Sequence, residues 1–236
     1  LPPETGRPMT VIQNHRTFRF GSPEGLLSAQ MAELTGNFDA PAQKAEGRLT
    51  GRVQAHTCQL GRIGPVVIKS YFRGGLLRHM NKRTYLYLGR ARSQAEFEML
   101  QHVRQIGINA PEPVAYAVQG RLLYRAWLVT KQIPDAVPLS ELSFTDPATA
   151  QKVLPAVVEQ IRILACRGIH HVDLHPGNVL VDARGRACFI DFDRARSRVR
   201  NQRRLLRRYA QRWKRAADKY GLPGFVREAL SGHDPE

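Results

Sequence analysis

The chain has 236 residues, 42% hydrophobic and 24% charged, a balance that excludes wholesale disorder and fits a soluble globular protein of one domain or two small lobes. No uncharged apolar run approaches the roughly 20 residues that a membrane-spanning helix needs, and no hydrophobic segment near the start indicates a secretory signal. The three cysteines, Cys58, Cys166 and Cys188, are far apart, which favours the reduced thiols of a cytosolic protein over a disulfide framework or a zinc site.

Positive charge is concentrated near the C-terminus. The net charge is +16, and residues 194–219 contain twelve Lys or Arg but one acidic residue, Asp218. This segment therefore carries +11 and the remainder only +5. Such a basic segment predicts an anionic partner, namely a membrane surface, a polyanionic substrate or nucleic acid.

The first part of the chain is dominated by predicted strands. Residues 1–8 lack periodicity and are expected to be a flexible terminus or a tag remnant. Residues 17–35 indicate a strand followed by a helix. Short strands punctuated by glycine are predicted over residues 47–71. Within them the β-branched run 66–68 is typical of a central strand, which we expect to end at Lys69.

The middle of the chain predicts one helix and a hairpin. Apolar residues at helical spacing favour a helix over residues 93–106, which ends at a glycine. Two prolines then force an extended connector. Alternation over residues 114–133 predicts two strands joined by a turn at Gln119-Gly120. Two further prolines, beginning at Pro134, indicate a linker and a lobe boundary.

Helices are predicted to dominate the last part. Residues 148–167 have helical periodicity, and Pro155 is expected either to set the first turn of that helix or to kink it. Two short strands are predicted at residues 179–181 and 188–190. A long basic helix follows from about Arg198 to Tyr220 and ends at a glycine.

This order predicts an α+β fold with two lobes. Residues 9–133 would form a small N-terminal lobe with an antiparallel sheet and one main helix. Residues 134–236 would form a short, mainly helical C-terminal lobe.

Two motifs in the predicted C-terminal lobe indicate the chemistry. Residues 171–178 read His-Val-Asp-Leu-His-Pro-Gly-Asn, and residues 190–193 read Ile-Asp-Phe-Asp. Asp173, Asn178 and Asp191 thus have the order and spacing found in kinase-type phosphotransferases. That chemistry needs a carboxylate to accept a hydroxyl proton and hard oxygen ligands to hold Mg²⁺ against the phosphates of ATP.

A lysine and a glutamate upstream complete the predicted ATP site. Kinase-like sites use a strand lysine on the α- and β-phosphates and a helix glutamate to hold that lysine. Lys69 and Glu96 fit this order. Glu98 is the alternative glutamate, but Glu96 can face the cleft while Phe97 and Leu100 occupy the apolar side.

Two weaker signals have alternative interpretations. Gly47 and Gly51 are candidates for a phosphate-covering loop, although turns use glycine for the same backbone reason. The histidine cluster around Asp173 could suggest a transition metal, but adjacent residues of one tight loop rarely converge on such an ion. We therefore expect His171 to brace the loop through a backbone hydrogen bond and Mg²⁺ to bind through Asn178 and Asp191.

The predicted terminal helix has an apolar stripe surrounded by arginines. Its members are Leu205 or Leu206, Tyr209, Trp213, Ala216 and Tyr220. In one interpretation the stripe packs on the lobe and the arginines are solvated. In the other the basic surface docks on anionic lipid headgroups. Aromatic residues are not interleaved as a stacking platform, so no stable nucleic-acid partner is expected.

The chain resembles the 3-deoxy-D-manno-octulosonic acid (Kdo) kinases, which are lipopolysaccharide-core kinases of Gram-negative bacteria. The similarity extends from about Gly47 to Tyr220. It is carried by Tyr-Phe-Arg-Gly-Gly-Leu at residues 71–76, by Asn81-Lys82, and by Arg92-Ser93 leading into Ala-Glu-Phe at residues 95–97. The Arg-Gly-Gly-Leu stretch is its most family-specific part.

The resemblance implies a protein-kinase-like fold and a role for each motif residue. Asp173 would be the catalytic base, and Asn178 and Asp191 the magnesium ligands. Lys69 would contact the ATP phosphates with Glu96 as its partner.

The resemblance also implies an acceptor and a location. The family transfers the γ-phosphate of ATP to the 4-hydroxyl of Kdo on a lipid A precursor, an anionic glycolipid, at the cytoplasmic face of the inner membrane. The basic surface suits such a peripheral enzyme, and the implied substrate contacts are Arg73, Gly74, Gly75 and Lys82.

Three other functions fit the sequence less well. A protein kinase is disfavoured because only 45 residues follow Asp191 and none forms an Ala-Pro-Glu segment. A small-molecule kinase of the aminoglycoside type shares the His-Pro-Gly of residues 175–177, but its cationic substrates need acidic pockets. A non-catalytic scaffold that binds lipid or RNA would not need Lys69, Asp173 and the metal-binding pair together.

Overall fold

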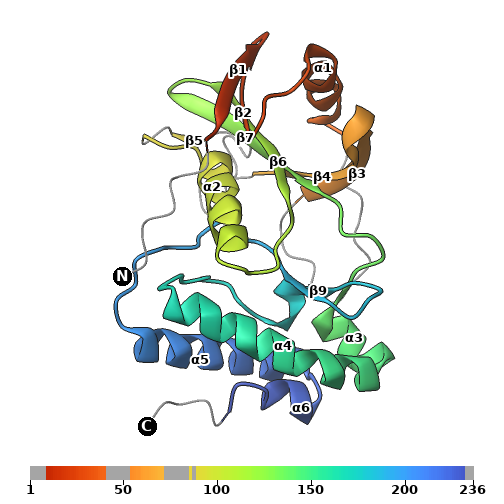
Figure 1. The fold of residues 1–236 in the computed structure, drawn as a ribbon, viewed down its shortest axis with the longest axis vertical. Helices are drawn as coiled ribbons and strands as arrows, with labels where there is room; N and C mark the ends of the chain where they lie inside the picture. The colour runs from red at the N-terminus through yellow and green to blue at the C-terminus, as the bar shows by residue number, and fades with distance from the viewer. Residues whose placement is uncertain (1–8, 41–53, 72–84, 87–88, 232–236) are drawn as a thin grey trace. The chain divides into compact units, whose positions relative to one another are not determined.

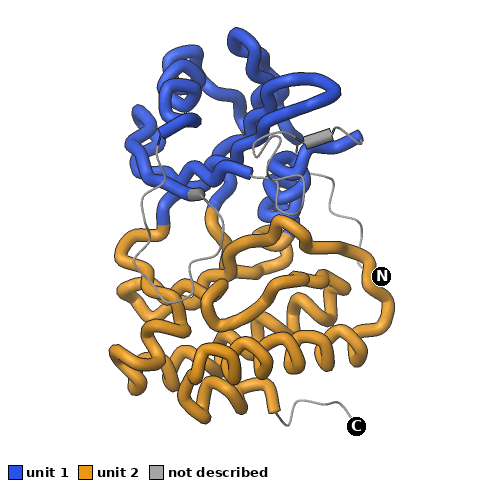
Figure 2. The backbone as a smooth tube through the Cα atoms, turned by 180° about the vertical axis from the view of Figure 1, so that it is seen from behind, with its two compact units in different colours: residues 1–46, 50–102, 112–132 blue, residues 47–49, 103–111, 133–236 orange. Residues whose placement is uncertain are grey.

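The computed structural model describes residues 9–40, 54–71, 85–86 and 89–231. The chain divides into two compact units (Figure 2). Of the described residues, unit 1 contains 9–40, 54–71, 85–86, 89–102 and 112–132, and unit 2 contains 103–111 and 133–231. Each unit has its own sheet and its own buried core.

Unit 1 is built on one antiparallel sheet (Figure 1). Its strands follow the spatial order β1 (Val11–His15), β2 (Phe18–Ser22), β6 (Pro113–Gly120), β7 (Leu123–Lys131), β4 (Gly64–Ser70) and β3 (Gln54–Leu60), with β5 (Tyr85–Leu86) also paired to β7. A 3-10 turn, η1 (Gly61–Ile63), joins β3 to β4. Gly120 ends β6 at φ 99°, where an added Cβ would lie 2.2 Å from the carbonyl oxygen of Leu123. The predicted hairpin is therefore confirmed, but its turn lies at residues 121–122, directly after the predicted Gln119-Gly120.

Two helices belong to this part of the chain, and both were predicted. The main helix is α2 (Arg92–Gln105), and the helix predicted within residues 17–35 is α1 (Ser28–Asn37), which contacts β1 and β3. Met31 and Leu34 of α1 join an aromatic core in which the Phe38 and Trp127 rings stack at 4.5 Å. The indole nitrogen of Trp127 also donates to the carbonyl of Phe38 at 3.1 Å, so the residue after α1 is fixed to the sheet.

Unit 2 is mainly helical. It contains α3 (Leu139–Thr145), α4 (Pro147–Cys166), α5 (Gln202–Tyr220), α6 (Gly224–Arg227), the 3-10 turn η3 (Pro176–Asn178) and a three-stranded sheet of β10 (Ala187–Phe189), β9 (Val179–Val181) and β8 (Val137–Pro138). Helices α4 and α5 lie side by side (Figure 1). No helix in the described ranges is long and apolar enough to cross a membrane.

The start of α4 differs from the prediction. Asp146 caps the helix by accepting the backbone N–H of Thr149, and Pro147 occupies the first turn. Pro155 instead lies inside the helix, so it does not set the first turn. The segment that was predicted as a linker instead contains β8 and α3. Helix α3 was not predicted because it is too short to show clear periodicity.

Helix α5 has the apolar face that its sequence predicted. Leu205, Tyr209, Trp213 and Ala216 are buried, and the Trp213 indole donates to the carbonyl of Val226 at 2.7 Å. The helix starts at residue 202 because Asn201 caps it, and the predicted start at Arg198 is wrong: that residue has the left-handed φ of 68°. Gly221 ends the helix at φ 60°, as expected for a glycine C-cap.

Candidate active site

In unit 1 a buried ion pair joins β4 to α2. Lys69 Nζ lies 2.9 Å and 2.8 Å from the two carboxylate oxygens of Glu96. β4 is an interior strand between β3 and β7, so Lys69 is held by backbone pairing on both sides. The side chain of Glu96 is only 2% exposed and that of Lys69 14%. At such burial each charge requires the other.

Tyr71 completes this arrangement. Its hydroxyl contacts the Glu96 carboxylate, and its ring faces Lys69 Nζ at 5.3 Å from the centroid. The buried carboxylate thus accepts hydrogen bonds from an ammonium and from a phenol, which offsets its loss of water. Glu98, the alternative glutamate, instead pairs with Arg90 at the surface. The structure therefore brings Lys69 together with Glu96 and not with Glu98.

In unit 2 the loop that carries Asp173 is braced by backbone hydrogen bonds on both sides. His170 exchanges two backbone hydrogen bonds with Arg196, of 2.7 Å and 3.0 Å. Gly168, at φ 65°, precedes this bridge, and an added Cβ would lie 2.7 Å from the carbonyl oxygen of Val199. The buried Tyr209 hydroxyl of α5 accepts the backbone N–H of His171 at 2.9 Å. Helix α5 is thus tied to the loop.

His171 braces the loop from within, as predicted. Its ring is 1% exposed, lies 4.5 Å from the Phe192 ring centroid, and has Nε2 2.9 Å from the carbonyl oxygen of Ile190. Because a carbonyl only accepts, Nε2 carries the hydrogen. Burial lowers the pKa of His171, against the opposing effects of the Ile190 hydrogen bond and of the Asp191 and Asp173 charges. A neutral imidazole therefore connects the two motif segments.

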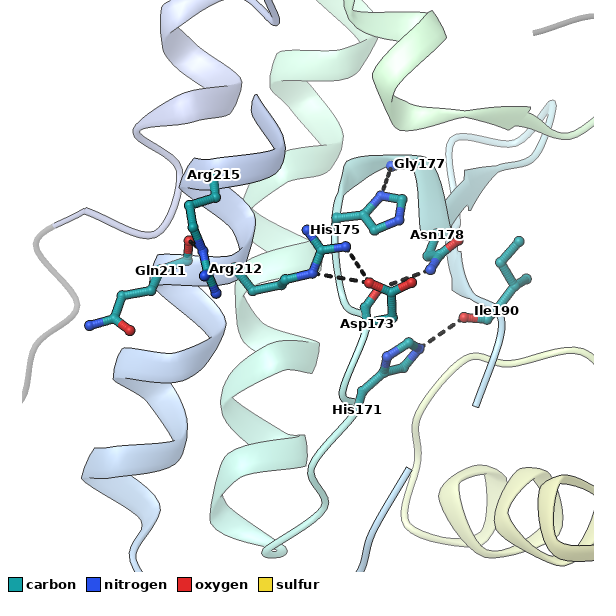
Figure 3. A network of polar contacts seen from close by, with 9 residues as sticks. All are labelled: His171, Asp173, His175, Gly177, Asn178, Ile190, Gln211, Arg212 and Arg215. Carbon is teal, nitrogen blue, oxygen red and sulfur yellow. Dashed lines mark hydrogen bonds and ion pairs between the residues drawn. The ribbon is translucent and has the colours of Figure 1, made fainter. Parts of the chain in front are cut away.

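The three motif residues of unit 2 lie around this brace. Asn178 Nδ2 donates to the backbone carbonyl of Asp173 at 2.9 Å (Figure 3). The backbone carbonyl of Asn178 accepts the N–H of Ile190 at 3.0 Å, directly before Asp191. Asp191 has a left-handed φ of 66°, which few residues other than glycine, Asn and Asp adopt readily. Such a conformation at a motif aspartate is typical of functional sites.

Two contacting residues were missed by the sequence analysis. Arg212 of α5 donates from Nε to Asp173 Oδ1 at 3.0 Å, and its Nη2 contacts the same oxygen. Tyr71 could have been found from the alternation of β4, since residues 69 and 71 share one face of an extended chain. Arg212 has a weaker signal: it follows Tyr209 by three residues on the edge of the buried stripe.

Six predicted site residues lie outside the residues that the structure describes. They are Gly47, Gly51, Arg73, Gly74, Gly75 and Lys82. Their proposed contacts with ATP and with the acceptor stay predictions.

Comparison with known proteins assigns the family. The model of the lipopolysaccharide kinase (Kdo/WaaP) family matches residues 38–223. Similar curated proteins include the 3-deoxy-D-manno-octulosonic acid kinase of Vibrio vulnificus (strain CMCP6), 31% identical over 177 residues, which are 72% of this chain and 73% of that protein. The protein with the same name from Stenotrophomonas maltophilia (strain K279a) is 33% identical over 159 residues, 61% of each chain.

The architecture agrees with this assignment. An antiparallel sheet with helices in unit 1 and a mainly helical unit 2 are consistent with the protein-kinase-like α+β fold that was predicted. Kinase membership implies ATP as the phosphoryl donor. The chain belongs to the lipopolysaccharide kinase (Kdo/WaaP) family and is a phosphotransferase that acts on an alcohol group.

Proposed function

We propose that this protein transfers the γ-phosphate of ATP to a hydroxyl of Kdo, specifically O4, on a lipid A precursor. The observation that carries the proposal is the Asp173 carboxylate: it is 51% exposed, yet it stands on a loop fixed by backbone hydrogen bonds. Asn178 and Asp191 are tied into the same loop. The similar proteins that bear the name Kdo kinase support the choice of acceptor.

Asp173 is proposed as the catalytic base. The acceptor hydroxyl oxygen forms a bond to the γ-phosphorus while the bond from that phosphorus to the β–γ bridging oxygen breaks and ADP leaves. The hydroxyl proton passes to the Asp173 carboxylate. Oδ1 is occupied by Arg212, so Oδ2 is the oxygen assigned to the proton.

Asn178 and Asp191 are proposed to hold Mg²⁺. Their fit rests on donor chemistry: the Asn178 amide nitrogen is already engaged by the Asp173 carbonyl, which leaves the amide oxygen for a cation. Asp191 adds a carboxylate next to the Ile190 segment that hydrogen-bonds Asn178. Both groups are hard oxygen ligands, the kind that Mg²⁺ prefers. When bound, Mg²⁺ would neutralise charge on the β- and γ-phosphates.

Lys69 is proposed to contact the ATP phosphates. Its ammonium group at the end of β4 donates to Glu96 and lies over the Tyr71 ring, so the lysine reaches the nucleotide already oriented. Gly47 and Gly51 are proposed to supply a loop that covers the phosphates.

The acceptor side of the proposal rests on charge. A Kdo-lipid A precursor carries sugar carboxylates and lipid phosphates, and residues 194–219 carry +11. Arg73, Gly74, Gly75 and Lys82 are proposed to contact this anionic substrate. The protein is further proposed to act as a peripheral enzyme at the cytoplasmic face of the inner membrane.

The test compares three acceptors in detergent micelles with Mg-ATP: a Kdo-lipid A precursor, the same lipid without Kdo, and an aminoglycoside. We expect the wild type to add one phosphate to the first acceptor alone, and two-dimensional NMR of the product to show phosphorus coupled at C4 of Kdo. Phosphorylation of the aminoglycoside, or of the lipid without Kdo, would contradict the proposal. Phosphate on another Kdo hydroxyl would contradict only the assignment to O4.

A further inference from the structure

Arg212 contacts the proposed catalytic base from an element that carries none of the motif residues. Its Nε lies 3.0 Å from Asp173 Oδ1, and Nη2 contacts the same oxygen (Figure 3). A guanidinium has five N–H donors, so three remain after this contact. Those three donate to no residue that the structure describes, and the side chain is 33% exposed. Arg212 is therefore able to bind a second anion beside Asp173.

Arg212 is held in place from both sides along α5. Tyr209, one turn earlier, is buried and hydrogen-bonds the loop at His171 and Ile169. Trp213, the next residue, is anchored to Val226. Arg215, one turn later, donates to the carbonyl of Gln211 in its own helix and points away from Asp173 (Figure 3). The contact with Asp173 is thus specific to position 212.

The chemistry of the proposed acceptor requires a cation at this place. Kdo carries a carboxylate on the ring that also carries the reacting hydroxyl, and the base that receives the proton is itself a carboxylate. Two like charges within a few ångströms repel each other strongly in a partly buried site. The neighbouring His175 directs Nδ1 to the backbone N–H of Gly177, so this ring nitrogen is an acceptor and supplies no positive charge. Arg212 is the described side chain that pairs with Asp173.

We infer that Arg212 recognises the carboxylate of the sugar acceptor with its remaining N–H donors while it holds Asp173 Oδ1. The inference rests on the proposed function. It makes Arg212 a specificity residue for acidic sugars: the fork that orients the base also selects an acceptor whose carboxylate lies beside the reacting hydroxyl.

The test is a cycle of two enzymes and two acceptors. Kdo-lipid A precursor and its Kdo methyl ester are compared as substrates of the wild type and of Arg212→Gln. We expect the wild type to favour the acid over the ester by about 10- to 100-fold in kcat/KM, the value of a charge-assisted hydrogen-bonded contact, and Arg212→Gln to lose that preference. The matched control, Arg215→Gln, removes the same charge one turn away and should keep the wild-type ratio.

The outcomes separate the inference from the function on which it rests. An unchanged acid-to-ester ratio in Arg212→Gln, even with slower turnover, would show that Arg212 only positions Asp173 and would overturn the inference. If turnover is too slow to follow, calorimetric titration of the two acceptors gives the acid-to-ester ratio of their dissociation constants instead. Failure of the proposed function would appear differently, as a wild type that phosphorylates neither acceptor.

Discussion

In unit 1 the charged pair of Lys69 and Glu96 is buried, and each side chain depends on the other for its charge. In unit 2 Asp173 is half exposed, and what is fixed there is the backbone of its loop, through His170, His171 and Tyr209. In unit 1 the residues proposed for catalysis also stabilise the fold. In unit 2 the proposed catalytic side chain is not part of what stabilises its loop. Substitutions in the two units should therefore differ in what they damage.

Among the proposed metal-binding residues, a large effect on turnover without loss of stability is expected from Asp191→Asn. Asn tolerates the left-handed conformation of this position, so the backbone is preserved while one proposed Mg²⁺ ligand loses its charge. Loss of several kcal/mol of charge stabilisation predicts a fall in kcat of about 1000-fold. The melting temperature should stay within about 2 °C. Steady-state kinetics over a Mg²⁺ titration, with calorimetry of the same samples, measures both.

The proposed difference between the two units would be contradicted if Asp191→Asn unfolded at a much lower temperature or retained kcat within a few-fold. Asp218→Asn is a matched control, because Asp218 is an exposed carboxylate of the same unit that pairs with Arg227. It should change neither quantity.

Lys69→Met is expected to damage both stability and turnover. It leaves the Glu96 carboxylate buried without its counter-ion, which costs about 3–5 kcal/mol of unfolding free energy. The double variant Lys69→Met with Glu96→Gln removes both charges and should recover most of that loss without recovering activity. Urea denaturation of the two variants gives the difference. A double variant no more stable than the single one would show that the pair is not coupled by burial.

A third prediction concerns the basic surface of α5. Arg203, Arg204 and Lys214 are exposed, and each basic residue near an anionic membrane contributes about 1 kcal/mol. Replacing all three with Gln should weaken partitioning onto vesicles that contain phosphatidylglycerol by roughly 100-fold at low salt, as measured by pelleting.

A control with the same charge change distinguishes a specific surface from total charge. Arg16, Arg62 and Arg121 are exposed in unit 1, and their replacement with Gln should have a much smaller effect on pelleting. Equal losses in the two triple variants would mean that net charge alone drives binding. No loss in the α5 variant would leave this helix a packing element only.

The smallest effect is expected from pH. Burial lowers the pKa of His171 in the folded state, so below the unfolded value of about 6.5 the unfolded chain takes up the proton more readily. This contribution to stability is present above about pH 6.5 and is lost as pH falls below it. We expect the melting temperature of the wild type to fall between pH 7 and pH 5. It should fall less steeply in His171→Asn, and identical slopes would assign the effect to other groups.

Local patterns predicted much of the fold. The β-branched run 66–68 forms an interior strand, and the apolar stripe of α5 is buried, because both depend on spacing along one element. The β1–β2 hairpin was missed, since its turn places Arg16 at φ 53° without the Asn-Gly or Asp-Gly pair that usually marks such turns. The helix α3 was not predicted, because it has only seven residues and lies between Pro138 and Pro147.

The site residues that belong to a sequence motif could be predicted, whereas a contact between elements far apart in the sequence could not. Asp173, Asn178 and Asp191 stand out by their order, and the Lys69–Glu96 contact follows from a known pairing of strand and helix. Arg212 reaches Asp173 across 39 residues, by the way α5 packs on its loop. The way α5 packs against the loop determines which of its arginines faces Asp173. The spacing of residues within α5 does not predict that packing.

We propose that this protein phosphorylates Kdo and that Asp173 accepts the proton of the acceptor hydroxyl. The most direct measurement is transfer of labelled γ-phosphate from Mg-ATP to a Kdo-lipid A precursor by the wild type and by Asp173→Ala, at saturating ATP. We predict labelled lipid with the wild type and a rate lower by about 100- to 10,000-fold with Asp173→Ala, whose ATP affinity and melting temperature are unchanged. Equal rates for the two proteins would contradict the role of Asp173, and no labelled lipid with a wild type that binds ATP would contradict the proposed Kdo kinase function.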